Sequence, residues 1–178
     1  RTILNFAAHH LDLGAHRVMI YLDAPNDTAQ KALKAHPKCR VTLCDDNYWR
    51  RRKKRPVNHQ PRQSVNATHC YNRHPKVDWL AHIDADEFLW PERPLAAQLG
   101  DLPPTVRSTR IRPVEALAPD PNDPPSDGLT YFKSYTSDQR QRLVQTSQIY
   151  PTYGGNLNGG FLSHLAGKVF VRTGLKDI

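Results

Sequence analysis

The sequence lacks any run of eighteen apolar residues, so we expect no helix that spans a membrane. It also lacks, at its start, the basic, apolar and small-residue pattern of a signal peptide. Cysteine is scarce: the three are Cys39, Cys44 and Cys70, and none of them forms a CxxC pair. An odd number without that spacing argues against a disulfide framework or a zinc knuckle, and it favours reduced thiols in a cytosolic compartment.

The composition predicts one soluble globular domain over residues 1–178, since 38% of the residues are hydrophobic and 24% are charged. Cations outnumber anions and leave a net charge of +8. This excess favours anionic partners, namely nucleic acid, membrane lipid or a phosphorylated substrate. The chain opens with Arg1 in a helix-like segment and stops after a strand-like one. We therefore expect a domain truncated at its N-terminus, and we leave open a truncation at its C-terminus.

Helical and strand patterns alternate along the first half of the chain. Apolar residues recur at helical spacing over residues 3–11, and a strand follows at 17–22. The next turn holds Asn26 and Asp27, either of which can cap a helix over residues 28–35. The further expected elements are a strand from Cys39, a helix at 62–73, a strand at 78–88, a short helix at 94–99 and strands at 108–114 and 168–173, with loops at 47–60, 118–128 and 150–160.

This order of elements predicts an α/β fold with a mostly parallel, Rossmann-like sheet and helices on both faces. In open α/β sheets the ligand lies beyond the carboxyl ends of the strands. Carboxylates follow three of the predicted strands, and they are Asp23, Asp45, Asp46, Asp84 and Asp86. We therefore expect several acidic side chains to converge on one edge of the sheet.

The acidic cluster Asp84-Ala85-Asp86-Glu87 follows an apolar segment. If the strand continues past Ile83, Asp84 and Asp86 point to the same face, because strand side chains alternate. Two carboxylates at one place repel each other unless a cation or a proton neutralises them. Mg²⁺ and Mn²⁺ prefer oxygen ligands and often share them with substrate phosphates. The alternative interpretation is that Asp84 caps a helix and that Asp86 and Glu87 form a solvated turn.

At this point the sequence resembles a known family. The resemblance rests on AAHHLDLGAHRVMIYLDAPND, DDNYWR, RQSVNATHCYNR and DWLAHIDADEFLWP, and it continues through RIRPVEAL and GFLSHLAGKVFVRTG. These segments look like the bacterial branch of the family-two-like glycosyltransferases, which have the GT-A fold. The resemblance implies that Asp84 and Asp86 form a DxD motif that binds the metal and the diphosphate of a nucleotide-sugar donor. It implies that Asp23 contacts the nucleoside, that a first strand precedes Arg1, and that sugar transfer proceeds with inversion.

Other residues have a functional and a plainer interpretation. Arg62 opens a predicted helix and suits a donor phosphate, although surface polarity explains it equally well. Lys168 is a candidate for binding the donor phosphate, and its plainer interpretation is a charge at the edge of a strand. His164 is a candidate metal ligand or acceptor contact, and its plainer interpretation is a loop histidine. An inverting transferase needs a carboxylate that deprotonates the acceptor hydroxyl. Glu115 is our first candidate for that base and Asp138 our second. The alternative interpretation is that either is only a surface acid.

The densest charge is the basic run, RRRKKR at residues 50–55. It can steer a phosphorylated donor or an anionic acceptor, bind nucleic acid, or be a solvated loop. Its only aromatic neighbours are Tyr48 and Trp49, at one edge.

The leading hypothesis is a metal-dependent, Mn²⁺- or Mg²⁺-using glycosyltransferase that moves a sugar from a nucleotide-sugar donor to a hydroxyl. The expected acceptor is a saccharide, a lipid-linked molecule or a protein, and the expected location is the cytoplasm, including the inner face of the membrane. A basic nucleic-acid-binding module and a phosphatase with a DxD motif are the alternatives. The phosphatase fits less well, because its motif usually opens the domain and is followed by a small residue where Phe88 stands.

Overall fold

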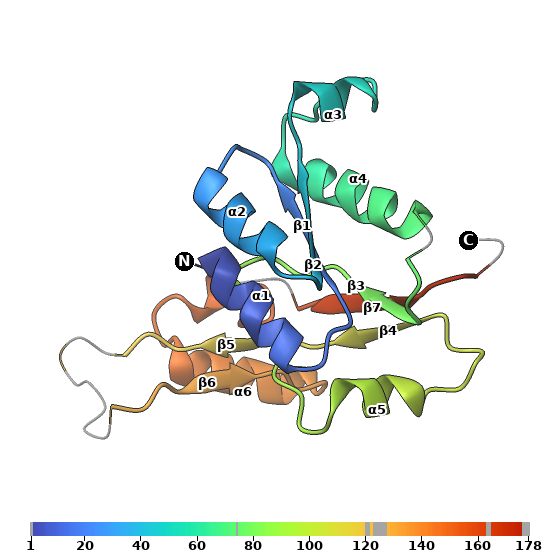
Figure 1. Ribbon diagram of the computed structural model, residues 1–178. Coiled ribbons are helices and arrows are strands. Elements are labelled where there is room, and N and C mark those ends of the chain that lie inside the picture. The colour runs from blue at the N-terminus through green and yellow to red at the C-terminus, as the bar shows by residue number, and fades with distance from the viewer. Residues whose placement is uncertain (1, 74, 120–121, 123–127, 163–164, 176–178) are drawn as a thin grey trace. The chain divides into compact units, whose positions relative to one another are not determined.

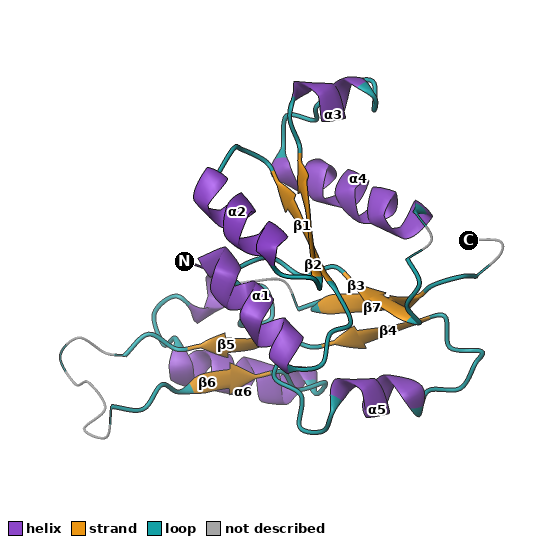
Figure 2. Cartoon of the chain, in the orientation of Figure 1, coloured by secondary structure: helices purple, strands orange, loops and turns teal. Residues whose placement is uncertain are grey.

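A computed structural model describes residues 2–73, 75–119, 122, 128–162 and 165–175 (Figure 1). The chain divides into two compact units. Unit 1 comprises Arg1–Ser108 and Val171–Ile178, and unit 2 comprises Thr109–Phe170. The secondary structure drawn in Figure 2 is a mixture of helices and short strands, so the expectation of an α/β protein is confirmed.

The elements follow one another in this order along the chain. The first eight are α1 (Thr2–Asp12), β1 (Val18–Leu22), α2 (Asp27–Ala35), β2 (Cys39–Leu43), α3 (Asp46–Arg50), α4 (His59–Asn72), β3 (Trp79–Ala81) and α5 (Leu95–Gly100). The remaining six are β4 (Ser108–Ile111), β5 (Val114–Ala116), β6 (Phe132–Ser134), α6 (Gln139–Ile149), the 3₁₀-helix η1 (Gly154–Asn156) and β7 (Lys168–Arg172).

The strands of the described residues form three small sheets. β1 and β2 pair in parallel, from Val18 opposite Cys39 to Leu22 opposite Leu43. β7 lies between β3 and β4 in a three-stranded sheet, and β5 pairs with β6 in antiparallel fashion. The parallel arrangement is therefore confirmed for β1 and β2. A single Rossmann-like sheet is not what these strands form, and the GT-A fold stays a prediction.

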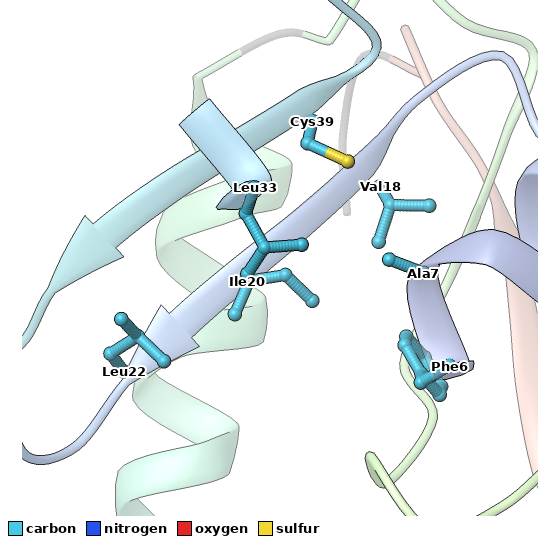
Figure 3. Close-up of a cluster of buried hydrophobic side chains, with 7 residues drawn as sticks. All are labelled: Phe6, Ala7, Val18, Ile20, Leu22, Leu33 and Cys39. Carbon is cyan, nitrogen blue, oxygen red and sulfur yellow. The ribbon is translucent and has the colours of Figure 1, made fainter. Parts of the chain in front are cut away.

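The core of unit 1 is built on one face of β1 (Figure 3). Val18, Ile20 and Leu22 alternate along the strand and are all buried, as the period of two for a half-buried strand requires. Leu33 of α2 and Phe6 of α1 are buried in the same cluster. Because α2 connects two neighbouring parallel strands, β1, α2 and β2 form one βαβ unit.

The other face of β1 contacts α4. The hydroxyl of Tyr21 lies 2.9 Å from Nδ1 of His69, and Sγ of Cys70 lies 3.1 Å from Sδ of Met19. The three cysteines of the chain are buried and free. Helices therefore cover both faces of the two-stranded sheet. These contacts hold α4 so that its first turn lies beyond the end of β1.

Three boundaries predicted from the sequence are wrong. The expected loop at 47–60 contains most of α3, because Asp45 caps that helix by accepting a 2.8 Å hydrogen bond from the Tyr48 amide. The strand expected at 108–114 is interrupted after Ile111, since Pro113 has no N–H to donate to a ladder. The strand expected at 78–88 ends at Ala81, with consequences for the acidic cluster that are given below. The cap of α2 is as expected: Asn26 accepts from the Ala29 amide at 3.0 Å.

Candidate functional site

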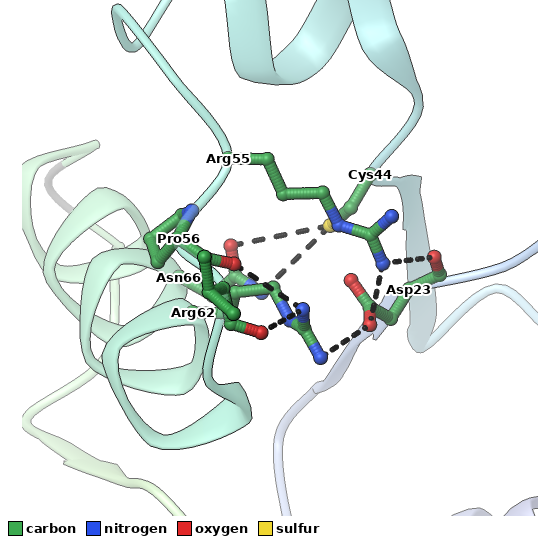
Figure 4. A network of polar contacts seen from close by, with 7 residues as sticks. Asp23, Cys44, Arg55, Pro56, Arg62 and Asn66 are labelled. Carbon is green, nitrogen blue, oxygen red and sulfur yellow. Dashed lines mark hydrogen bonds and ion pairs between the residues drawn. The ribbon is translucent and has the colours of Figure 1, made fainter.

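Asp23 is the first residue after β1, and its carboxylate binds two arginines (Figure 4). Oδ2 accepts from Arg55 at 2.9 Å and from Arg62 at 3.2 Å. The side chains of Arg55 and Asp23 are nearly half exposed, whereas that of Arg62 is only 19% exposed. One carboxylate thus faces two guanidinium groups, and the local charge is positive.

Arg62 lies in the first turns of α4, where it also holds the segment before the helix. Its Nη1 donates to the carbonyl oxygen of Val57 at 3.0 Å and to that of Pro56 at 3.3 Å. The predicted helix at 62–73 is thus confirmed, with a start three residues earlier, at His59. Since Arg62 is anchored by two carbonyls, its guanidinium is already in place beside Asp23.

Gln63, the next residue of α4, reaches the acidic cluster. Its Nε2 donates to Oδ1 of Asp84 at 2.7 Å. Two adjacent residues of one helix therefore hold two carboxylates from different parts of the chain, Asp23 and Asp84. The convergence of all five acidic side chains on one edge stays a prediction, and the contact with Asp84 depends on Gln63, which the sequence analysis did not single out.

The acidic cluster forms a turn instead of a strand end. The chain leaves β3 after Ala81, and the Glu87 amide donates to the Asp84 carbonyl oxygen at 3.0 Å. The inference that Asp84 and Asp86 share a strand face is therefore wrong, because strand alternation does not hold across a turn. The turn places Asp84 half-buried against Gln63 and Asp86 exposed. No described residue forms a hydrogen bond or ion pair with the Asp86 carboxylate.

Cys44, Tyr48 and Asn66 form a polar cluster that the sequence analysis did not identify. Asn66 of α4 accepts a 2.6 Å hydrogen bond from the Tyr48 hydroxyl. It also contacts the Cys44 thiol (Figure 4). Burial raises the pKa of Cys44 to about 11 and that of Tyr48 to about 12. The Cys44 thiol and the Tyr48 hydroxyl are therefore uncharged near pH 7. They fix α3 and α4 against the end of the parallel sheet.

Two histidines of α1 support the segment that follows the acidic cluster. The Leu89 amide donates to Nε2 of His10 at 3.4 Å, and the Leu89 carbonyl oxygen lies 2.7 Å from Nε2 of His9. Nδ1 of His10 lies 2.8 Å from the Phe6 carbonyl oxygen, so His10 carries its proton on Nδ1. Burial lowers the pKa of His10, which keeps the ring neutral and able to accept from Leu89.

Asp45 and Asp46, the other two acidic residues expected at the edge of the sheet, belong to α3 or its cap. Asp45 is its N-cap and Asp46 lies in its first turn, where a carboxylate interacts favourably with the helix dipole. Their positions are therefore explained by the helix that the sequence analysis missed.

The remaining candidates belong to unit 2. Oε2 of Glu115 accepts from the Leu162 amide at 3.0 Å, and Asp138 is the N-cap of α6, accepting from the amides of Arg140 and Gln141. Lys168 is half-buried in β7 and has an interaction partner of its own. His164 lies outside the described residues.

A buried lysine is the most unusual group of unit 2. Lys133 of β6 lies opposite Glu115 of β5 and is 3% exposed. Its ammonium donates to the Thr146 hydroxyl at 3.2 Å and to the Gly160 carbonyl oxygen at 2.5 Å. Burial lowers the pKa of Lys133, while the Glu115 carboxylate acts in the opposite direction. Lys133 thus joins the β5–β6 pair, α6 and the loop after η1.

Asp84 and Asp86 offer the oxygen ligands that a hard divalent cation prefers, but they offer too few of them to hold it alone. They offer carboxylate oxygens, the ligand type that Mg²⁺ and Mn²⁺ take, on a single turn. Among the described residues there is no group of three or more His, Cys, Asp or Glu side chains placed to hold a metal ion. A cation at this turn would therefore need further oxygens from water or a phosphorylated ligand, which is how Mg²⁺ is commonly bound.

Comparison with known proteins identifies the class of the molecule. The family model of glycosyltransferase family 92 matches residues 1–159, which include the Asp23–Arg62 ion pair and the acidic turn. The chain is therefore a glycosyltransferase. It belongs to glycosyltransferase family 92, where the sequence analysis had expected a family-two-like enzyme. No curated protein and no solved structure matches the chain significantly. In the part of the chain that the structure describes, no helix is long and apolar enough to cross a membrane.

Proposed function

We propose that this glycosyltransferase moves a sugar from a nucleotide-sugar donor to a hydroxyl of a saccharide, lipid-linked or protein acceptor, with Mn²⁺ or Mg²⁺ and with inversion. The observation that carries the proposal is the pair of contacts made by adjacent residues of α4. Arg62 binds Asp23 and Gln63 binds Asp84, so the residues expected to meet the nucleoside and the diphosphate are linked through one helix turn. A GT-A-like fold of a bacterial, cytoplasmic enzyme belongs to the same proposal.

Both acidic and basic side chains would hold the donor. Asp84 and Asp86 would hold the cation, which when bound neutralises charge on the diphosphate leaving group. Arg62 contributes a fixed cation beside Asp23, and a pre-positioned guanidinium suits phosphate oxygens. Asp23 orients Arg62, and we assign to it the contact with the nucleoside. Lys168 and His164 remain proposals for the donor phosphate and for the metal.

For the base that deprotonates the acceptor, we retain Glu115 as the first candidate and Asp138 as the second. Asp138 accepts two backbone N–H groups as the cap of α6, and protonating it would weaken that cap by about 1 kcal/mol. Glu115 accepts from the Leu162 amide through Oε2, so protonating it would weaken no helix cap.

The alternatives from the sequence have less support than sugar transfer. Membership in a glycosyltransferase family favours a sugar donor over the phosphoesters of a DxD phosphatase. A module that binds single-stranded nucleic acid combines its basic groups with accessible aromatic rings on which bases stack. Tyr48 is 8% exposed and Trp49 3%, so neither ring offers a stacking face.

The proposal is tested by thermal unfolding with nucleoside diphosphates and their sugars, with and without Mn²⁺. A bound donor at a hundredfold excess over its dissociation constant stabilises the protein by about 2.7 kcal/mol. Asp86→Asn should abolish the Mn²⁺-dependent part without changing the stability of the unliganded chain, because this carboxylate is exposed and has no described partner. Asp84→Asn should abolish it too, and should in addition lower stability by about 1 kcal/mol, since the Gln63 bond loses its charge.

Asp12→Asn is the matched control, because Asp12 is an exposed carboxylate at the end of α1. It should leave donor binding unchanged. Normal Mn²⁺-dependent stabilisation of the Asp86→Asn variant by a nucleotide sugar would refute the assignment of the metal to this turn.

A further inference from the structure

The basic run at residues 50–55 is held in a defined conformation at its centre and at its C-terminal end. At its centre the Arg52 guanidinium lies 3.5 Å from the centroid of the Tyr48 ring and donates to the Tyr48 carbonyl oxygen at 2.9 Å. At its end Arg55 is paired with Asp23. Between them Lys53 adopts φ 76°, a left-handed conformation that usually calls for glycine. The run is therefore a bent, anchored loop.

The anchors leave most of the charge of the loop without a counter-ion. Arg50, Arg51, Lys53 and Lys54 are exposed, and none of them forms an ion pair within the described residues. Charges of one sign crowded within a few residues repel one another, and this repulsion is relieved by an anionic surface. The loop consequently presents four unneutralised cations to the outside.

An apolar side chain stands next to these cations. Val57 is 92% exposed, and its carbonyl oxygen is bound to Arg62, so the backbone is fixed while the side chain points to solvent. A row of cations followed by a fully exposed apolar residue suits the boundary between lipid headgroups and acyl chains. It does not suit the base stacking of a single-stranded nucleic acid, because Tyr48 and Trp49 are buried and offer no ring for a base.

We propose that the loop of residues 50–57 is a docking surface for an anionic phospholipid membrane. This proposal is independent of the sugar-transfer proposal, since it needs neither donor nor metal. The loop is joined to the end of β1 by the Arg55–Asp23 ion pair, so docking would bring that end of unit 1 close to the lipid surface. Lipid headgroups there are the substrates or carriers that an enzyme with a lipid-linked acceptor would meet.

The test is sedimentation of the whole chain with vesicles of phosphatidylcholine alone and with about 30% phosphatidylglycerol, whose surface is anionic. Binding should require the anionic lipid and should weaken as salt rises. Each basic residue near an anionic surface contributes about 1 kcal/mol, so Lys53→Gln with Lys54→Gln should reduce the partition constant about thirtyfold. Lys31→Gln with Lys34→Gln is the matched control, because both lysines are exposed on α2 and the change in net charge is the same.

Two more variants separate the contributions of charge, apolar contact and folding. Val57→Ser should weaken vesicle binding at high salt, where the electrostatic part is screened. Lys53→Gly removes a cation and also relieves the left-handed backbone, so it should bind vesicles about fivefold more weakly while unfolding at the same or a higher temperature. An equal loss in the α2 control pair, or tighter binding to an oligonucleotide than to the anionic vesicles at matched salt, would overturn the proposal.

Discussion

Asp23→Asn tests whether one carboxylate organises the candidate donor site. The substitution keeps the shape of the side chain and removes the charge that two arginines share. The Arg55 pair is nearly half exposed on both sides, so solvent screening limits it to about 0.5 kcal/mol. The Arg62 pair involves a guanidinium that is 19% exposed, and a hydrogen bond between charged groups there contributes about 1 kcal/mol after discounting for the exposed Asp23.

The sum is a loss of about 1.5 kcal/mol in the free energy of unfolding, or about 3–6 °C in Tm for a chain of this size. Urea unfolding, followed through the buried Trp49, measures the loss. A double-mutant cycle with Arg62→Gln should give a coupling energy of about 1 kcal/mol, whereas a cycle with Arg55→Gln should give about half as much. Coupling energies near zero for both arginines would refute the role assigned to Asp23.

Two further predictions concern stability. Burial raises the pKa of Cys44 from 9.0 to about 11, so the stabilisation that comes from its protonated thiol is complete below pH 9 and is lost as the pH rises to 11. Two pKa units correspond to about 3 kcal/mol, so Cys44→Ala should flatten the fall of unfolding free energy between pH 9 and pH 11, and an unchanged slope would contradict this. Gly160→Ala should destabilise the chain by about 3 kcal/mol in thermal unfolding, because φ is +80° and a Cβ would meet Thr146 and Lys133. Gly155→Ala is the control: nothing lies within 4 Å of its Cβ, so equal losses for both variants would refute the argument.

The parts of the fold that were predicted from sequence are those set by short-range patterns. β1, α2 and β2 follow from alternating apolar residues, an Asn26 cap and a buried Leu33, all of which act within a few residues. α3 was missed because its stability depends on burying two adjacent aromatic residues, Tyr48 and Trp49, against other segments. Adjacent apolar residues make no helical stripe, so the pattern carried no signal for a helix.

The candidate site shows the same division. The position of Asp23 after a strand was readable, because strand length and the following turn are local. The contact between Gln63 and Asp84 was not, since it joins side chains 21 residues apart and depends on how α4 packs on β1. The end of β3 at Ala81 was not readable either, because an apolar run continues in sequence after strand pairing has stopped.

The turn at Asp84 changes what the pair of carboxylates can do. On a strand, Asp84 and Asp86 would be equivalent and would repel each other at a fixed distance. On the turn they differ: Asp84 is half-buried and held by the Gln63 amide, which partly offsets its charge, while Asp86 is exposed. If the proposed cation binds here, Asp84 would supply a carboxylate in a fixed position and Asp86 one that can adjust, and the remaining oxygens would come from water or from the phosphorylated donor. The asymmetry therefore favours a site completed by the donor over a preformed metal centre.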